Sequence, residues 1–357
     1  MTNGTIRVLD HADVADVVRR AGADAFMDEV IERLADAIGD HRPEVLETQP
    51  RGGFSYHKPA LGLVEWMPAM ELGRRVGVKT VGYHPSNPAE RRLPSVYANT
   101  TLYDTTTGRL TAICDSTMLT AIRTGAASAI ATDILAIDGS VRLGVIGCGA
   151  QAVTQIHAIS RVRTVTEVVA FDADADVAAT LADRVGAVVP GVRIRIADDA
   201  GAVARAVDVL CTVTSVDIGA GPVFADDGLR DWLHVNAVGA DFPGKTEVPL
   251  STLRRAAVFP DYPPQCVVEG EAQQLDPAEL DVDFPSLVAR RAEFRDLRGR
   301  LTVFDSTGWA VEDLIAADVA FEHAERLGVG REIELHHDAL DPFSPYESLL
   351  VGATQEA

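Results

Sequence analysis

The sequence predicts an α/β protein of two domains, and three observations lead to this prediction. First, the chain has 357 residues, which is enough for two domains of about 150 residues each. Second, from residue 141 onward, apolar stretches of strand length alternate with stretches of helical periodicity, as in a parallel sheet covered by helices. Third, the first of those strands runs into a glycine-rich turn, so the residues before it need a fold of their own.

The residues before the turn predict an antiparallel sheet with a helix. Apolar side chains three and four positions apart predict a helix over 12–38. Asp115 and Ser116 are typical helix caps, so a long helix is expected over 117–136. Between these helices, short apolar stretches predict strands at residues 61–67, 76–81, 97–103 and 110–114.

From residue 141 onward, predicted strands and helices alternate. The strands are expected at residues 141–146, 167–171, 192–196, 208–214, 233–239, 256–259 and 301–304. The helices between the first of them are expected at residues 150–162, 174–186 and 199–206. A last helix over 311–327 is expected to return to the first domain, which would make that domain discontinuous.

The glycine-rich turn has the pattern of a dinucleotide-binding site. Gly147-x-Gly149-x-x-Ala152 follows the first strand of the alternating region and opens the next helix. Gly147 permits a tight bend, Gly149 lets the backbone approach a pyrophosphate, and Ala152 lets the helix pack close to the strand. The positive end of that helix would face the phosphates.

Asp172 strengthens this interpretation, since it ends the second strand, where an acid that binds ribose hydroxyls is expected. It lies somewhat beyond the usual spacing of about 20 residues. No arginine occurs among the next four residues, and a carboxylate repels the 2′-phosphate of NADP. The sequence therefore predicts a Rossmann-type domain that binds NAD.

The composition excludes several classes of protein. The formal charge of −21 argues against nucleic acid or an anionic membrane as partner, because both need a basic face. No apolar stretch approaches the roughly 18 residues of a membrane span, and residues 1–19 lack the apolar core of a signal peptide, so a cytoplasmic location is expected. The four cysteines are scattered without histidines at ligand spacing, so we expect neither a metal site nor a disulfide framework.

Two charged residues stand where ligands or buried partners are expected. Asp241 follows the strand 233–239, at the carboxyl end of a parallel strand, where ligands of α/β sheets bind, although it could also be a turn residue. Arg123 lies on an apolar helix face and needs an anionic partner. That partner could be a ligand carboxylate or pyrophosphate, or an internal ion pair with Asp115 or Asp133.

Four more polar residues lie in or after predicted strands. Lys79 and Glu65 lie in two apolar strands of the first domain, where they could form a structural pair or handle protons beside a substrate carboxylate. Thr214 and Ser306 follow strands of the parallel sheet, where their hydroxyls could contact the cofactor or simply stabilise turns.

Seven motifs, in order and over nearly the whole chain, resemble the ornithine cyclodeaminase/mu-crystallin family. They are Glu65-x-Met67-Pro68, Lys79-x-x-x-x-His84-Pro85-x-Asn87, Leu119-Thr120-Ala121-x-Arg123-Thr124, Gly147-x-Gly149-Ala150-Gln151, Asn236-Ala237-Val238-Gly239-x-Asp241-x-Pro243-Gly244-Lys245-Thr246-Glu247, Glu269-Gly270-Glu271-x-Gln273-Gln274-Leu275 and Phe304-Asp305-Ser306. In detail, Trp66, Lys79-Thr80-Val81-Gly82-Tyr83 and Arg123-Thr124-Gly125-Ala126-Ala127-Ser128 look more like bacterial lysine cyclodeaminases than ornithine enzymes.

The resemblance implies roles for individual residues. Asp241 would be the general acid/base, and Lys79 and Glu65 would lie in the same catalytic pocket. Lys79 and Arg123 would hold the substrate carboxylate, with Arg51 matching an upstream substrate arginine. No metal is implied. The residues expected to contact NAD are Gly147, Gly149, Ala150, Gln151, Asp172, Thr214, Lys245, Ser306 and Ser95.

The implied activity is the NAD-dependent cyclodeamination of a basic L-amino acid, from L-lysine to L-pipecolate or from L-ornithine to L-proline. Ammonia is released through a transient imine, and the hydride removed from the substrate is returned. Residues 121–308 would form the NAD-binding domain, and residues 1–120 with 309–357 an α+β domain for substrate binding and homodimerisation. The alternatives are a ketimine reductase or amino-acid dehydrogenase of the same family, or a non-catalytic nucleotide- and ligand-binding protein of mu-crystallin type.

Overall fold

The computed structural model describes residues 4–336, 341–346 and 349. In that part of the chain, the second half forms a seven-stranded sheet with the order β10-β9-β8-β11-β12-β14-β13. Every neighbouring pair in this sheet is parallel. Its strands are β8 (Ser140–Ile146), β9 (Thr164–Phe171), β10 (Ile194–Ile196), β11 (Val209–Thr212), β12 (His234–Ala237), β13 (Ala257–Pro260) and β14 (Thr302–Asp305).

Helices follow most strands of this sheet, as the alternating pattern predicts, although β11 leads to β12 without one. The central strands β11, β12 and β14 are buried at every position, as is typical of a parallel sheet with both faces covered. The predicted helix 174–186 is interrupted at Thr180. The helices are α5 (Ala150–Val162), α6 (Ala175–Ala179), α7 (Leu181–Gly186), α8 (Ala200–Ala206), α9 (Leu250–Leu253), α10 (Pro263–Glu269) and α11 (Phe284–Ala289), with 3₁₀ turns η1 (Glu271–Gln274), η2 (Pro277–Glu279) and η3 (Arg291–Gly299).

The first part of the chain, together with β15 from residues 331–334, forms an eight-stranded mixed sheet within the described residues, with the order β15-β1-β7-β6-β5-β4-β2 and β3 paired with β4. Its strands are β1 (Thr5–Leu9), β2 (Leu46–Thr48), β3 (Gly52–Tyr56), β4 (Gly62–Glu71), β5 (Arg75–Tyr83), β6 (Val96–Asp104), β7 (Leu110–Asp115) and β15 (Arg331–Glu334). The strands β1, β2, β3 and β15 were not predicted from the sequence. The pair β1–β7 is parallel, which corrects the expectation of a purely antiparallel sheet.

The N-terminal helical region differs from its prediction at two places. The helix expected over 12–38 is two helices, α1 (His11–Ala21) and α2 (Ala23–Gly39), because Gly22 adopts a positive φ of 88° that ends α1. The side chain of Asp115 accepts from the Thr117 amide, whereas Ser116 makes no capping bond. A short helix, α3 (Asn87–Arg91), precedes β6.

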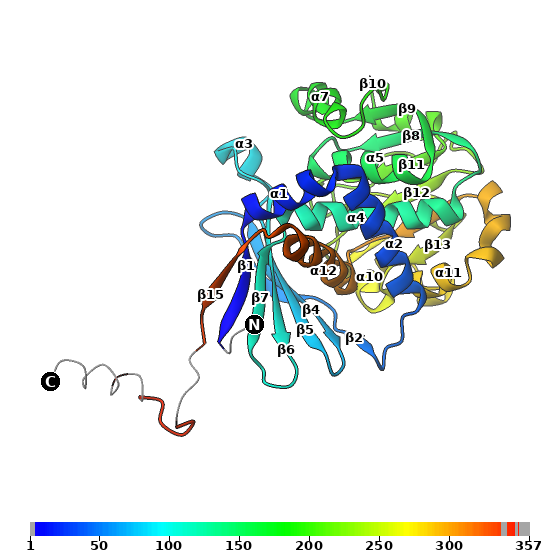
Figure 1. Cartoon of the computed structure of the whole chain (residues 1–357). Helices are drawn as coiled ribbons and strands as arrows, with labels where there is room; N and C mark the ends of the chain where they lie inside the picture. The colour runs from blue at the N-terminus through cyan, green and yellow to red at the C-terminus, as the bar shows by residue number, and fades with distance from the viewer. Residues whose placement is uncertain (1–3, 337–340, 347–348, 350–357) are drawn as a thin grey trace.

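Two long helices, α4 (Thr117–Leu135) and α12 (Ala310–Leu327), lie between the sheets (Figure 1). Leu314 of α12 packs with Met67 and Leu102 of the N-terminal sheet. β15, which follows α12, pairs with β1. The strand that follows α12 therefore joins the N-terminal sheet, while the predicted domain boundaries stay a prediction.

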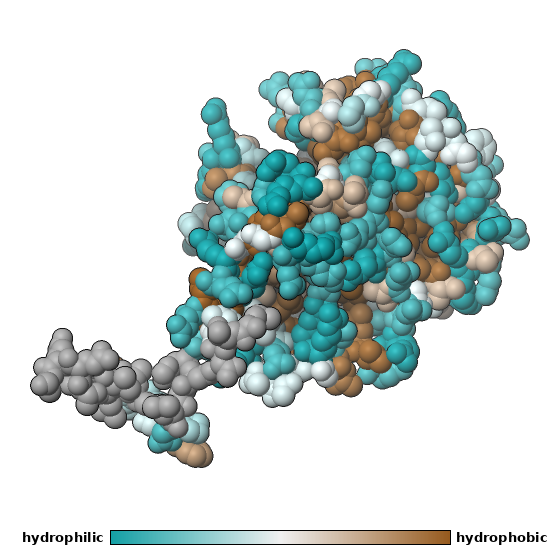
Figure 2. Space-filling model, in the orientation of Figure 1, coloured by the Kyte–Doolittle hydropathy of each residue, from teal (hydrophilic) through white to brown (hydrophobic). Residues whose placement is uncertain are grey.

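The surface agrees with the acidic composition. Figure 2 shows mainly hydrophilic residues over α1 and α2 on the face turned to the viewer. In the described part of the chain, no helix combines the length and apolar character needed to cross a membrane. The same residues contain no cluster of histidine, cysteine and acidic side chains suited to a metal ion.

Candidate active site

A cavity of about 360 Å³ lies where the carboxyl ends of the parallel strands face the N-terminal sheet. Residues of β4 and β5 line one side of it, and the residues that follow β11, β12 and β14 line the other. Ligands of α/β sheets bind at this edge. The lining brings together eight predicted site residues, namely Arg51, Glu65, Lys79, Arg123, Gln151, Asp241, Lys245 and Ser306.

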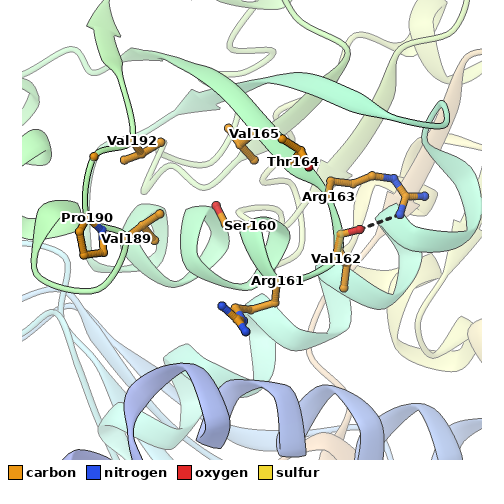
Figure 3. A pocket seen from close by; sticks show the side chains of 10 residues that line it. Ser160, Arg161, Val162, Arg163, Thr164, Val165, Val189, Pro190 and Val192 are labelled. Atoms are coloured by element: carbon orange, nitrogen blue, oxygen red, sulfur yellow. Dashed lines mark hydrogen bonds between the residues drawn. The ribbon is translucent and has the colours of Figure 1, made fainter.

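A second hollow, of about 510 Å³, lies at the opposite edge of the parallel sheet, near the amino ends of β9 and β10 (Figure 3). None of its lining residues belongs to the predicted site. Its two arginines are engaged elsewhere, since Arg161 pairs with Asp28 and Arg163 pairs with Asp133. We therefore assign the active site to the first cavity.

Lys79 and Arg123 come from different elements but share a carboxylate, Asp313. Lys79 Nζ, on β5, donates to Asp313 Oδ1 at 3.0 Å, and Arg123 Nε, on α4, donates to the same oxygen at 3.0 Å. Arg123 Nη1 also donates to Glu312 Oε2 at 2.6 Å. All four side chains are buried.

Arg123 has other partners than expected, and these contacts shift the pKa values of the residues involved. The ion pair exists, but with Glu312 and Asp313 of α12 instead of Asp115 or Asp133. Burial lowers the pKa of Lys79 to about 8, although Asp313 opposes this effect. Burial would also lower the pKa of Arg123, but Asp313 and Glu312 outweigh it and raise that pKa. Burial raises the pKa of Glu312 to about 8, with Arg123 opposing.

Arg51, just before β3, is the third cation of the cavity. Its Nε lies 2.7 Å from Glu269 Oε1, and its Nη1 donates to Glu65 Oε2 at 3.4 Å. Glu65 therefore pairs with Arg51, and Lys79 with Asp313, instead of with each other. Burial raises the pKa of Glu65 and raises that of Glu269 to about 7, while Arg51 lowers both.

Asp241 lies four residues beyond β12, in a loop that opens into the cavity. Lys245 Nζ donates to Asp241 Oδ1 at 2.9 Å. Gln273 braces the loop, because it accepts from the Gly244 amide at 2.6 Å and donates to the Lys245 carbonyl at 3.0 Å. The side chain of Asp241 is 43% exposed, so its carboxylate stays within reach of a ligand.

The glycine-rich turn fits a dinucleotide. Gly147 has a φ of 95°, and a Cβ there would lie 2.7 Å from the Val213 carbonyl oxygen, so the bend requires glycine. A Cβ on Gly149 would point into open space, which leaves room for a ligand beside the backbone. Gly149 also opens α5 without a side-chain cap, so the first amides of this helix suit a phosphate.

Asp172 lies at the end of β9, beside this turn. Its carboxylate accepts from the Cys148 amide at 2.6 Å and from the Asp174 amide at 2.9 Å. The carboxylate is thus fixed next to the turn, as expected of a group that would bind the ribose.

The remaining predicted cofactor residues differ in what they contact. Ser306 lines the cavity, and its buried hydroxyl has no hydrogen-bond partner in the described structure, so it suits a ligand. The Thr214 hydroxyl instead donates to Glu247 Oε1 at 2.6 Å. Ser95 is outside the cavity lining, and its carbonyl accepts from the His84 amide.

Sequence reasoning missed three acids that hold the cations of the site: Glu269, Glu312 and Asp313. Each had a weak signal in the sequence. Glu269 opens the motif Glu269-Gly270-Glu271, and the other two stand between the apolar residues Val311 and Leu314 in a predicted helix. Two acids at the start of an otherwise apolar helix face are favoured by the helix dipole and need a cation when buried.

The chain resembles known proteins over nearly its whole length. It is 40% identical over 342 residues to an L-lysine cyclodeaminase from Streptomyces rapamycinicus (strain ATCC 29253 / DSM 41530 / NRRL 5491 / AYB-994), covering 95% of this chain and 99% of that protein. A solved lysine cyclodeaminase, described for its recognition of L-lysine, L-ornithine and L-2,4-diamino butyric acid, is 42% identical, with a TM-score of 0.91 and coverage of 96% and 99%. An archaeal alanine dehydrogenase dimer with bound NAD is 30% identical, with a TM-score of 0.82 and coverage of 93% and 100%.

These likenesses confirm the predicted α/β fold class and the family suggested by the motifs. The model of the ornithine cyclodeaminase/mu-crystallin family matches residues 12–327, which is most of the chain. This chain therefore belongs to the ornithine cyclodeaminase/mu-crystallin family.

Proposed function

We propose that this chain is an NAD-dependent cyclodeaminase that acts on a basic L-amino acid, with L-lysine preferred to L-ornithine. The observation that carries the proposal is one cavity in which two buried cations, Lys79 and Arg123, face the same space as Asp241. Its placement at the carboxyl ends of the parallel strands suits a reaction beside a bound dinucleotide. The 40% identity to a lysine cyclodeaminase supports the choice of substrate.

NAD would be held by the turn from Gly147 to Gln151, with Asp172 at the ribose and Ser306 and Lys245 near the cavity. When bound, NAD supplies a hydride acceptor and then a hydride donor, so the complete reaction needs no net oxidation. Asp172 excludes a 2′-phosphate by charge repulsion, which favours NAD over NADP. The similar archaeal alanine dehydrogenase contains bound NAD, which agrees with this choice.

The cations fit the carboxylate of an amino acid. Arg123 uses Nε and Nη1 for its acidic partners, and because arginine has five N–H donors, others remain for a ligand. Lys79 adds a second positive charge from a different element, β5. Two donors from different elements fix a carboxylate at two points, and this fixes the α carbon relative to the cofactor.

The acids of the site fit a substrate with an additional amine. The site holds five acidic side chains and four cations, so an acid is available to an additional ammonium group even though burial raises the pKa of Glu312 to about 8. The cations are Arg51, Lys79, Arg123 and Lys245, and the carboxylates are Glu65, Asp241, Glu269, Glu312 and Asp313.

Asp241 is the group best placed to transfer protons during ring closure and loss of ammonia. Its Oδ1 is bound to Lys245, and its side chain is the most exposed of the site's carboxylates that form ion pairs. A general acid/base needs this access to the reacting amine. Lys245 stays protonated, because Asp241 raises its pKa against the effect of burial, and so keeps the carboxylate oriented.

We infer that the protein is a homodimer formed through the N-terminal sheet. Aromatic side chains lie on its outer face, with Phe54 71%, Trp66 41% and Tyr97 47% exposed. Phe54 and Trp66 contact each other edge to face at 5.7 Å. An exposed aromatic cluster of this kind marks an interaction surface, and the related alanine dehydrogenase is described as a dimer.

The test is to incubate the purified protein with L-lysine or L-ornithine and a trace of NAD⁺, and to follow ammonia together with NADH absorbance. A cyclodeaminase releases many equivalents of ammonia per NAD⁺ without accumulating NADH. Stoichiometric NADH would identify a dehydrogenase and overturn the proposal. NAD⁺ and amino-acid binding without turnover would identify a non-catalytic binding protein, and faster turnover of L-ornithine would reverse the substrate preference.

A further inference from the structure

One short segment after β14 contacts all three cations assigned to the substrate. Arg51 Nη2 donates to the carbonyls of Thr307 and Gly308. A Cβ on Gly308 would lie 2.6 Å from Arg123 Nη1, so the backbone there lies directly against the guanidinium. The segment then enters α12, whose Asp313 binds Arg123 and Lys79.

Asp313 links two elements that line the cavity, β5 and α4. Its carboxylate accepts from Lys79 on β5 and from Arg123 on α4, and Lys79 Nζ lies within 3.0 Å of both of its oxygens. The side chains of Lys79, Asp313 and Arg123 are 2%, 4% and 6% exposed, so solvent does not screen these contacts.

We propose that Asp313 is a positioning residue that sets the distance between the Lys79 and Arg123 donors, so that both reach one substrate carboxylate. This inference rests on the proposed function, since it assigns these cations to the substrate. Without Asp313, two cations in the same buried space would repel each other and turn apart. A displacement of about 1 Å in such a group can reduce catalysis by about 10²-fold.

Asp313 also keeps Lys79 charged. The charged groups that act on Lys79 are Asp313 of α12, Arg123 of α4, Arg51 before β3 and Glu65 of β4. Burial lowers the pKa of Lys79 to about 8, Asp313 raises it, and the two arginines lower it. Removing the charge of Asp313 therefore moves this pKa below 8, so Lys79 loses its proton at a lower pH.

The experiment compares Asp313→Asn with the wild-type full-length protein loaded with NAD⁺. We expect the KM for L-lysine to rise by about 10- to 100-fold, with NAD⁺ affinity unchanged. The alkaline limb of the kcat/KM profile should move to lower pH, because Lys79 deprotonates earlier. A purely structural role for Asp313 would not move this limb.

Asp318→Asn is the matched control. Asp318 lies on the same helix and forms a largely buried pair with Arg75 on the same strand as Lys79, but neither residue lines the cavity. This variant should lose similar thermal stability and keep the wild-type KM and pH profile. If Asp318→Asn changes the KM and the pH profile as strongly as Asp313→Asn does, the effect arises from packing and the inference is overturned.

Asp313→Glu decides the question if Asp313→Asn does not fold. It keeps the charge but moves the carboxylate by one methylene, so we expect a raised KM with an unshifted alkaline limb. The inference would be overturned if Asp313→Glu had the wild-type KM. It would also be overturned if a folded Asp313→Asn had an unchanged KM and an unchanged alkaline limb of the kcat/KM profile. These outcomes require a wild-type enzyme active on L-lysine, and a wild type without turnover would instead refute the proposed function.

Discussion

Replacing Arg123 with methionine removes the cation that compensates two buried acids. The side chains of Arg123, Glu312 and Asp313 are 6%, 0% and 4% exposed. Asp313 keeps Lys79 as a partner, so the group left without a partner is Glu312. Breaking a buried ion pair from one side costs about 3–5 kcal/mol. At about 2 °C per kcal/mol, a value suited to a long chain, the melting temperature should fall by about 6–10 °C.

The loss of stability in Arg123→Met should depend on pH, and the pKa of Glu312 determines whether this loss grows or shrinks as pH rises. Burial raises the pKa of Glu312 to about 8, above the unfolded value of about 4.3, so the folded state binds this proton more tightly. Stability is therefore lost as pH rises between these two values. Arg123 lowers the folded pKa, and without it this window extends above pH 8. The variant should thus be destabilised more at pH 9 than at pH 7.

The assay is thermal unfolding at both pH values, together with calorimetric titration of L-lysine. Adding Glu312→Gln to Arg123→Met removes the stranded acid and should recover most of the lost melting temperature at pH 9. Substrate binding should stay weak in both variants, because the cation is gone. This account of the ion pairs would be refuted if Arg123→Met were as stable as the wild type at pH 9. It would also be refuted if adding Glu312→Gln recovered none of the lost melting temperature.

Three further predictions concern catalysis, cofactor and assembly. Asp241→Asn should keep NAD⁺ binding while kcat falls by about 10²–10⁴-fold; near-wild-type turnover would remove its catalytic assignment. Titration of both cofactors should give tighter binding of NAD⁺ than of NADP⁺, because Asp172 repels a 2′-phosphate, and the reverse order would contradict this reasoning. Sedimentation at micromolar concentration should show a dimer that Trp66→Glu converts to a monomer, whereas a monomeric wild type would exclude the interface on the N-terminal sheet.

The parallel sheet could be predicted well because its signals are local. Apolar strands, helical periodicity and the turn at Gly147 each occupy one short stretch, and α5 begins and ends at the predicted residues. Asp241 was found by the same reasoning, because the end of a parallel strand is visible in the sequence. The N-terminal sheet was less predictable, since β1, β2 and β15 are short, and β1 and β15 pair with each other from opposite parts of the chain.

The ion pairs of the site depend on contacts that periodicity cannot predict. The pattern showed that Arg123 needs an anionic partner but offered only nearby candidates, and Asp133 is in fact paired with Arg163 and Arg291. The true partners lie about 190 positions later, on α12. They become neighbours only because α12 packs between α4 and the N-terminal sheet.

The rule that located Asp241 also explains why α12 reaches the cavity. β14 pairs with β12, so the residues after Asp305 emerge at the same sheet edge as the loop of Asp241. Ser306 was assigned from that position, and the chain needs only a few more residues to enter α12. The first turn of this helix favours acids, because its amides carry partial positive charge. The segment between β14 and the first turn of α12 thus supplies two things. Ser306 provides a hydroxyl for the cofactor, and Glu312 and Asp313 provide the carboxylates that hold the cations assigned to the substrate.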